Sequence, residues 1–93
     1  MNMSGLLSIK YIKTYKALSH PLRLELINSL FEKQRDVGEL GERLNIRQSN
    51  VSQHLRVLRK NGFVLSEKEG KRRIYSLNSD CKRLVSYLMK FKK

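Results

Sequence analysis

Apolar residues recur every three or four positions along most of the chain, which is the spacing of helices that bury one face. The first segment of this kind covers residues 6–18, and the second covers residues 21–31. Pro21 suits the first turn of the second helix, because the missing N–H of proline would be unpaired there anyway. Either Ser19 or His20 can cap that helix.

A helix-turn-helix is predicted in the middle of the chain. Its first helix covers residues 37–44, and Asp36 and Glu39 form a capping-box pattern at its start. Asn45 follows, and asparagine tolerates the left-handed backbone that ends a helix sharply. The second helix covers residues 48–61.

Gly41 lies inside the first of these two helices. A glycine in a helix interior costs about 1 kcal/mol relative to alanine, so it usually has a packing reason. We expect the two helices to approach each other closely at Gly41, just before the turn. The alternative is that the glycine only marks a fraying helix.

After residue 62, the pattern of apolar and polar residues repeats at every second position, which is the pattern of a strand and no longer that of a helix. Residues 63–68 and 72–77 are predicted to be short strands, joined by a turn that contains Gly70. These two strands would form a hairpin that follows the helix-turn-helix directly.

A last helix is predicted over residues 79–92, with Ser79 and Asp80 as its cap. Its apolar arc is wider than one small core requires, so the helix is either well buried within its own domain or also packed on a second subunit. The whole chain, residues 1–93, is short enough for one domain. The predicted fold is mainly α with a small β-hairpin, which is a winged helix-turn-helix.

Composition adds a strong positive charge. Twenty Lys and Arg against eight Asp and Glu give a net charge of +12. A charge of this sign favours a polyanionic partner, with nucleic acid first and an anionic membrane surface second. No apolar run approaches the ~20 residues of a membrane span, and the first residues lack the pattern of a signal peptide. We therefore expect a cytoplasmic protein.

The chain lacks the sequence motifs that are typical of enzymes and of metal sites. The chain has no CxxC or HExxH spacing, no glycine-rich phosphate loop and no GxSxG elbow, so we expect no enzyme. The single cysteine, Cys81, excludes an internal disulfide. Cys81 is either a redox sensor, favoured by the neighbouring Lys82 and Arg83, or a plain semi-buried residue.

The start of the second motif helix is polar but uncharged, as expected of a helix that contacts base edges in the major groove. The expected base-contacting residues are Gln48, Ser49, Asn50, Ser52, Gln53 and His54. Later residues of the helix and the hairpin carry the positive charge, which suits phosphates. The expected backbone contacts are Arg47, Arg56, Arg59, Lys60, Lys68, Lys71, Arg72 and Arg73.

Four runs of the sequence, residues 17–23, 37–44, 48–58 and 62–64, resemble the ArsR/SmtB family of bacterial and archaeal repressors. The resemblance implies a homodimer that binds an imperfect palindrome near a promoter and leaves it on an inducing signal. It also implies that the first and last helices, residues 6–18 and 79–92, form the dimer interface. The side chains expected there are Leu7, Tyr11, Tyr15, Leu84, Val85, Leu88 and Met89.

Many members of that family sense metals, and two kinds of metal site are known among them. One kind of site has cysteines in the first motif helix, but the corresponding residues of this chain, 37–41, are Val-Gly-Glu-Leu-Gly and include no cysteine. The other pairs Asp and His on the last helix, and here no histidine follows His54. Zinc-type sites need three or four thiolate, imidazole or carboxylate ligands. We expect no metal and no cofactor, and we interpret His20 as a capping residue.

Two functions from different classes stay open. The first is a sequence-specific regulator of transcription that binds double-stranded DNA as a repressor. The second is a sequence-tolerant architectural DNA-coating protein, for which the high charge is the argument. The uncharged start of the helix favours the first, because a coating protein needs charge at the groove more than amide groups.

Overall fold

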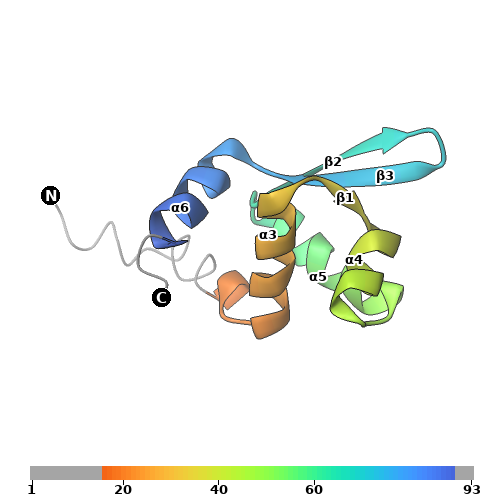
Figure 1. Cartoon of the computed structure of the whole chain (residues 1–93), viewed down its shortest axis with the longest axis horizontal. Helices are drawn as coiled ribbons and strands as arrows, with labels where there is room; N and C mark the ends of the chain where they lie inside the picture. The colour runs from red at the N-terminus through yellow and green to blue at the C-terminus, as the bar shows by residue number, and fades with distance from the viewer. Residues whose placement is uncertain (1–15, 90–93) are drawn as a thin grey trace, which may run out of the picture.

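The computed structural model describes residues 16–89, with side chains described through residue 87. This part is mostly helical and carries a small antiparallel sheet (Figure 1). The predicted fold class, mainly α with a small β-hairpin, is confirmed. The elements in chain order are α3 (Pro21–Glu32), β1 (Arg35–Asp36), α4 (Val37–Leu44), α5 (Gln48–Lys60), β2 (Val64–Glu69), β3 (Arg72–Leu77) and α6 (Ser79–Met89).

Local capping groups set where the first helices begin. The Nδ1 atom of His20 accepts a hydrogen bond from the backbone N–H of Leu22 at 3.2 Å, so His20 rather than Ser19 caps α3. At α4, Asp36 Oδ1 accepts from the Glu39 N–H at 2.8 Å, and Glu39 Oε1 accepts from the Asp36 N–H at 3.0 Å. The predicted capping box is therefore confirmed.

The turn between α4 and α5 is as tight as predicted. Asn45 adopts the left-handed conformation with φ of 56°, and the N–H of Ile46 donates to the Gly41 carbonyl at 2.9 Å. A Cβ atom built on Gly41 would lie 2.9 Å from the Ile46 carbonyl oxygen. The close approach that we expected at Gly41 is thus real, and the nearest atom belongs to the turn itself.

Strands β2 and β3 form the predicted hairpin, which projects beyond the helices (Figure 1). The turn has two residues, Gly70 and Lys71, and only Gly70 has a positive φ, of 64°. A positive φ at the first turn residue alone is typical of a type II′ turn, which matches the twist of the strands. The register pairs Ser66 with Tyr75 and Lys68 with Arg73.

A third strand was not predicted. Residues Arg35 and Asp36 form β1, which pairs with Tyr75 and Ile74 on the other edge of β3. The Arg35 side chain is buried, and its Nε donates to the Ser29 carbonyl at 3.0 Å. Strand β1 therefore joins the hairpin to the segment that enters α4.

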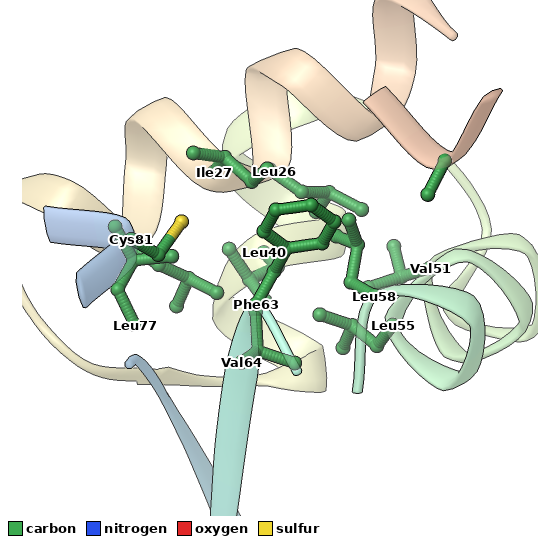
Figure 2. Packing of buried hydrophobic residues seen from close by; sticks show 12 residues of the cluster. Leu26, Ile27, Leu40, Val51, Leu55, Leu58, Phe63, Val64, Leu77 and Cys81 are labelled. Atoms are coloured by element: carbon green, nitrogen blue, oxygen red, sulfur yellow. The ribbon is translucent and has the colours of Figure 1, made fainter. Parts of the chain in front are cut away.

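The core lies where α3, α4 and α5 meet the base of the hairpin and the first turn of α6 (Figure 2). Phe63 and Leu77 close it from the side of the sheet. The fully buried large side chains are Leu26, Leu30, Leu40, Val51, Leu55, Leu58 and Val64. Within residues 16–89, no helix has the length and apolar character that crossing a lipid bilayer requires.

Helix α6 begins at Ser79 as predicted, but its capping residue differs from the prediction. Asn78 Oδ1 accepts from the Asp80 N–H at 2.8 Å, so Asn78 caps the helix. The prediction that Ser79 and Asp80 form the cap was wrong, because both already lie in the first turn. Asparagine at position 78 is itself a strong N-cap residue.

The expected dimer residues are only partly described. Val85 is half-buried against the core, whereas Leu84 is 43% exposed. Leu7, Tyr11 and Tyr15 lie outside the described residues, and so do the side chains of Leu88 and Met89. The role of residues 6–18 and 79–92 in dimerisation stays a prediction.

Candidate nucleic-acid interface

Helix α5 presents a strip of polar and basic side chains to solvent. Its apolar residues bury one side of the helix, so residues spaced three and four apart on the opposite side face outward. The outward strip consists of Ser49, Gln53, Arg56 and Lys60, all exposed. Ser52 and Arg59 flank the strip on the side of the hairpin, and Asn50 flanks it on the other side. Helix α5 contains no acidic residue.

The N-terminus of α5 has no side-chain cap. Arg47 occupies the cap position with an extended backbone and makes no side-chain capping hydrogen bond. Gln48 leans towards α4, since its Cγ lies 3.5 Å from the position of a Cβ on Gly41. Unpaired N–H groups and the positive end of the helix dipole favour an anion at such a terminus.

His54 does not join the exposed strip. Its Nδ1 accepts a hydrogen bond from Arg23 Nε of α3 at 3.2 Å, and its ring centroid lies 4.5 Å from that of His20. Burial, together with the charges of His20 and Arg23, lowers the pKa of His54. The structure therefore places His54 at the contact between α3 and α5 and not on the base-contacting face. The Arg23 side chain of α3 thus bridges these two helices.

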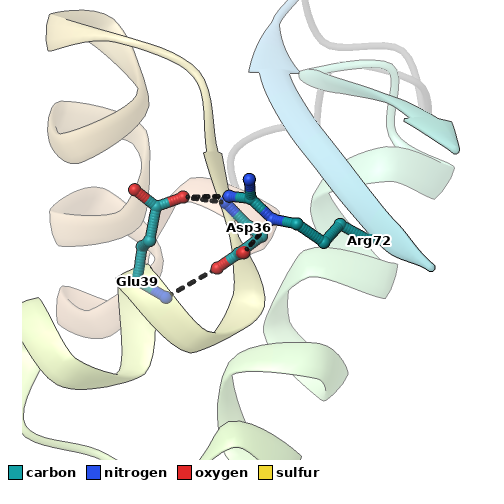
Figure 3. Close-up of polar contacts among 3 residues, drawn as sticks. All are labelled: Asp36, Glu39 and Arg72. Atoms are coloured by element: carbon teal, nitrogen blue, oxygen red, sulfur yellow. Dashed lines mark hydrogen bonds and ion pairs between the residues drawn. The ribbon is translucent and has the colours of Figure 1, made fainter. Parts of the chain in front are cut away.

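Arg72 also differs from the prediction. Its Nε donates to Asp36 Oδ2 at 2.7 Å, and its Nη2 donates to Glu39 Oε1 at 2.9 Å (Figure 3). The Glu39 backbone N–H and then the Arg72 guanidinium hold the pKa of Asp36 below its usual value. The pKa of Arg72 is raised, chiefly by Asp36. Arg72 thus ties the hairpin to the start of α4, and its charge is already paired.

Arg73, the next residue, lies on the opposite face of the hairpin. Its Nη1 donates to Ser66 Oγ at 3.1 Å, and Arg59 Nη1 of α5 donates to the same oxygen at 3.2 Å. Beside them is a hollow of about 260 Å³. The hollow is lined by Ser52, Leu55, Arg56, Arg59, Arg73 and Tyr75. The structure therefore brings predicted contacts from α5 and the hairpin together at one place.

Four of the other predicted phosphate contacts share one property. They are exposed, and within the described residues none of them pairs with a carboxylate. These are Arg47, Lys60, Lys68 and Lys71. Ser66 and Tyr75 were missed as site residues, although the period of two places both on the face of the hairpin that also carries buried Val64.

Cys81 lies within the core at 6% exposure. Burial raises the pKa of its thiol, which opposes the thiolate form that a redox sensor needs. Within residues 16–87, no three His, Cys, Asp or Glu side chains gather closely enough to hold a metal ion. The absence of a metal and of a cofactor remains a prediction.

Known proteins resemble this chain in sequence and in fold. The family described as "Bacterial regulatory protein, arsR family" matches residues 20–66. The transcriptional activator HlyU of Vibrio cholerae is 39% identical over 72 residues, which cover 77% of this chain and 67% of HlyU. The biofilm growth-associated repressor of Agrobacterium fabrum is 45% identical over 65 residues, which cover 70% of this chain and 56% of that repressor.

Solved structures agree with the fold. Reduced HlyU from Vibrio cholerae superposes with a TM-score of 0.84 at 31% identity, covering 99% of this chain and 98% of that one. The homodimeric winged helix-turn-helix DNA-binding domain Mb0332 from Mycobacterium bovis superposes with a TM-score of 0.85 at 23% identity, covering 98% and 85%. Both comparisons show a winged helix-turn-helix.

Proposed function

Because the chain belongs to the ArsR family of bacterial regulatory proteins, we propose that it is a homodimeric repressor of transcription that binds an imperfect palindrome in duplex DNA. The observation that carries this proposal is the exposed strip of α5, where uncharged Ser49 and Gln53 precede basic Arg56 and Lys60. In helix-turn-helix proteins the N-terminal residues of the second helix contact base edges. The polar half of the strip would specify sequence, and the basic half would bind phosphates.

Gln53 is the residue on which we place the most weight. It lies at the centre of the exposed strip and makes no hydrogen bond to another described residue that would hold its amide away from DNA. A glutamine amide can bond bidentately to the N6 and N7 edge of adenine. Ser49 and Ser52 can donate to or accept from several bases. Because His54 contacts α3, we leave it out of the proposed base-contacting set.

Dimerisation would supply the second half of the palindrome. Leu84 and Tyr87 expose apolar surface on α6, at the end of the molecule away from the tip of the hairpin (Figure 1). Two copies joined through α6 would carry their α5 helices to two half-sites, whose spacing follows the two-fold symmetry of the dimer. We further propose a cytoplasmic location, no enzymatic activity and no bound metal.

Competition binding tests the proposal. At fixed salt, a regulator should prefer its selected site over random duplex by ~10³-fold or more. Gln53→Ala should lose most of that preference while keeping non-specific affinity, and Gln34→Ala, an exposed glutamine between α3 and β1, is the matched control. Equal affinity for all duplexes would favour the second candidate, an architectural DNA-coating protein. An equal loss by Gln53→Ala on every duplex would remove its base-contacting role.

A further inference from the structure

Two guanidinium groups from different elements share one hydroxyl oxygen where α5 meets the hairpin. Arg59 and Arg73 both donate to Ser66 Oγ, at 3.2 Å and 3.1 Å. The strand register explains how they meet. Ser66 lies opposite Tyr75, so Arg73, two residues before Tyr75, points to the same face of the sheet and lies diagonally across from Ser66.

This cluster has hydrogen-bond donors left over and no acceptor. A serine hydroxyl has two acceptor lone pairs and one proton. The two arginines use the lone pairs, which leaves the Ser66 proton without an acceptor among the described residues. Each guanidinium keeps further N–H groups. Every free polar atom of the cluster is therefore a hydrogen-bond donor.

The positive charge of the cluster is also uncompensated. Within the described part of the chain, no Asp or Glu pairs with Arg59 or Arg73, and Arg56, across the adjacent hollow, also has no such partner. Arg72, one residue before Arg73, has two carboxylate partners. Like charges held around one oxygen repel each other, and an anion with several acceptor oxygens would relieve this repulsion.

We propose that this junction is a seat for one phosphodiester group of the bound duplex, held jointly by Arg59 and Arg73. Ser66 is the positioning residue, because it holds both guanidiniums and offers its own proton to the phosphate. The inference rests on the proposed function and deepens it. A phosphate bound at this seat would fix the hairpin relative to α5, and with it the depth at which Gln53 enters the groove.

A methylphosphonate scan locates the seat. Replacing one charged phosphate at a time in a selected site should weaken binding of the unaltered protein at one strong position per half-site. Arg59→Ala and Arg73→Ala should each lose part of the sensitivity to substitution at that same position, and the double variant should lose it there altogether. Mapping of the two arginines to different phosphates would overturn the shared seat and leave DNA binding intact.

The salt dependence gives a second measurement that needs no selected site. The slope of log affinity against log salt falls by about 0.9 for each phosphate that the protein no longer neutralises, however many side chains had contacted that phosphate. The double variant of Arg59 and Arg73 should therefore lower the slope by about 0.9 per subunit on random duplex. A fall of about 1.8 per subunit would mean two separate phosphates and would overturn the inference.

Ser66 is tested by three variants. Ser66→Ala should weaken binding by about tenfold on every sequence, since hydrogen bonds to charged groups are lost while sequence preference is kept. Ser66→Thr keeps the hydroxyl and should restore most of the affinity. Ser76→Ala, on the opposite face of the hairpin, is the matched control and should change nothing. Unchanged affinity in Ser66→Ala would overturn the positioning role.

Inorganic phosphate distinguishes a DNA phosphate from a free anion. The Nε–H resonances of Arg59 and Arg73 should shift on addition of duplex and stay unshifted with millimolar phosphate at matched ionic strength. Saturable shifts with phosphate alone, accompanied by competition with DNA, would assign the seat to a free anion and overturn the proposal. If the intact protein bound no duplex at all, both the proposed function and this inference would be overturned. The outcomes described above, in which the protein still binds DNA, overturn the inference alone.

Discussion

Gly41 and Gly38 lie in the same helix, and the structure predicts opposite effects for the same substitution. Alanine at position 41 would place its Cβ 2.9 Å from the Ile46 carbonyl oxygen. That oxygen belongs to the backbone of the turn, and the N–H of Ile46 is bonded to the Gly41 carbonyl at 2.9 Å. The turn can therefore relieve the contact only by distorting its own hydrogen bond.

The magnitude is a difference between two effects. Replacing glycine by alanine inside a helix stabilises the fold by about 0.5–1 kcal/mol, whereas overpacking costs about 1–3 kcal/mol. The difference predicts that Gly41→Ala lowers the free energy of unfolding by about 1 kcal/mol, and by at most about 2.5 kcal/mol. At Gly38 the nearest atoms to the added Cβ are Asp36 Oδ1 at 3.4 Å and Gln48 Nε2 at 3.6 Å, which are ordinary contacts. Gly38→Ala should be neutral or stabilising by up to about 1 kcal/mol.

Urea denaturation followed by circular dichroism measures both variants. Protein concentration must be equal and high in all samples, because dimerisation contributes to the apparent stability. A Gly41→Ala variant with the same free energy of unfolding as the parent, or equal changes in that free energy for the two substitutions, would refute the interpretation that the turn backbone requires glycine at position 41.

Other predictions concern charge, association and the thiol. Asp36→Asn keeps a capping side chain but loses the ion pair with Arg72. The pKa of Asp36 is lowered in the folded protein. The carboxylate therefore stabilises the fold above its unfolded pKa of about 4, and this stabilisation is lost as the pH falls through the folded pKa. Urea titrations should therefore show the wild type and Asp36→Asn differing at pH 7 and converging at low pH; a difference independent of pH would contradict this. Leu84→Lys should shift sedimentation towards the monomer, while an unchanged dimer would place the interface elsewhere. Cys81→Ser should match the parent in DNA affinity before and after oxidant, and a lost oxidant response would restore the sensor hypothesis.

Most of the fold could be predicted because its signals are local. The capping box of Asp36 and Glu39, the left-handed Asn45 and the glycine turn of the hairpin each depend on a few adjacent residues. Strand β1 could not be predicted in this way. A strand of two residues is too short to show a hydrophobic period, and its pairing with β3 joins positions that are 38 and 40 residues apart in the chain (74 − 36 and 75 − 35).

The candidate site was harder to predict for the same reason. The polar strip of α5 follows from helical spacing, but whether a particular polar residue at its edge faces DNA depends on neighbouring elements. His54 was grouped with the base-contacting residues because it follows Gln53. The side chain of Arg23, 31 positions earlier, holds its ring against α3. Ser66 was missed because a serine in a strand has no sequence signal until two arginines are seen around it.

Arg72 and Arg73 show how the structure divides a charge that the sequence presents as one group. Successive residues of a strand point to opposite faces, so one of two adjacent arginines must face α4 if the other faces α5. Asp36 and Glu39 pair with Arg72, and no acidic residue of α5 competes for Arg73. A count of the basic residues on the hairpin alone therefore overstates the positive charge that DNA can meet there, because Arg72 is already paired. The same alternation that uses one arginine to hold the hairpin in place leaves the next one available at the phosphate seat.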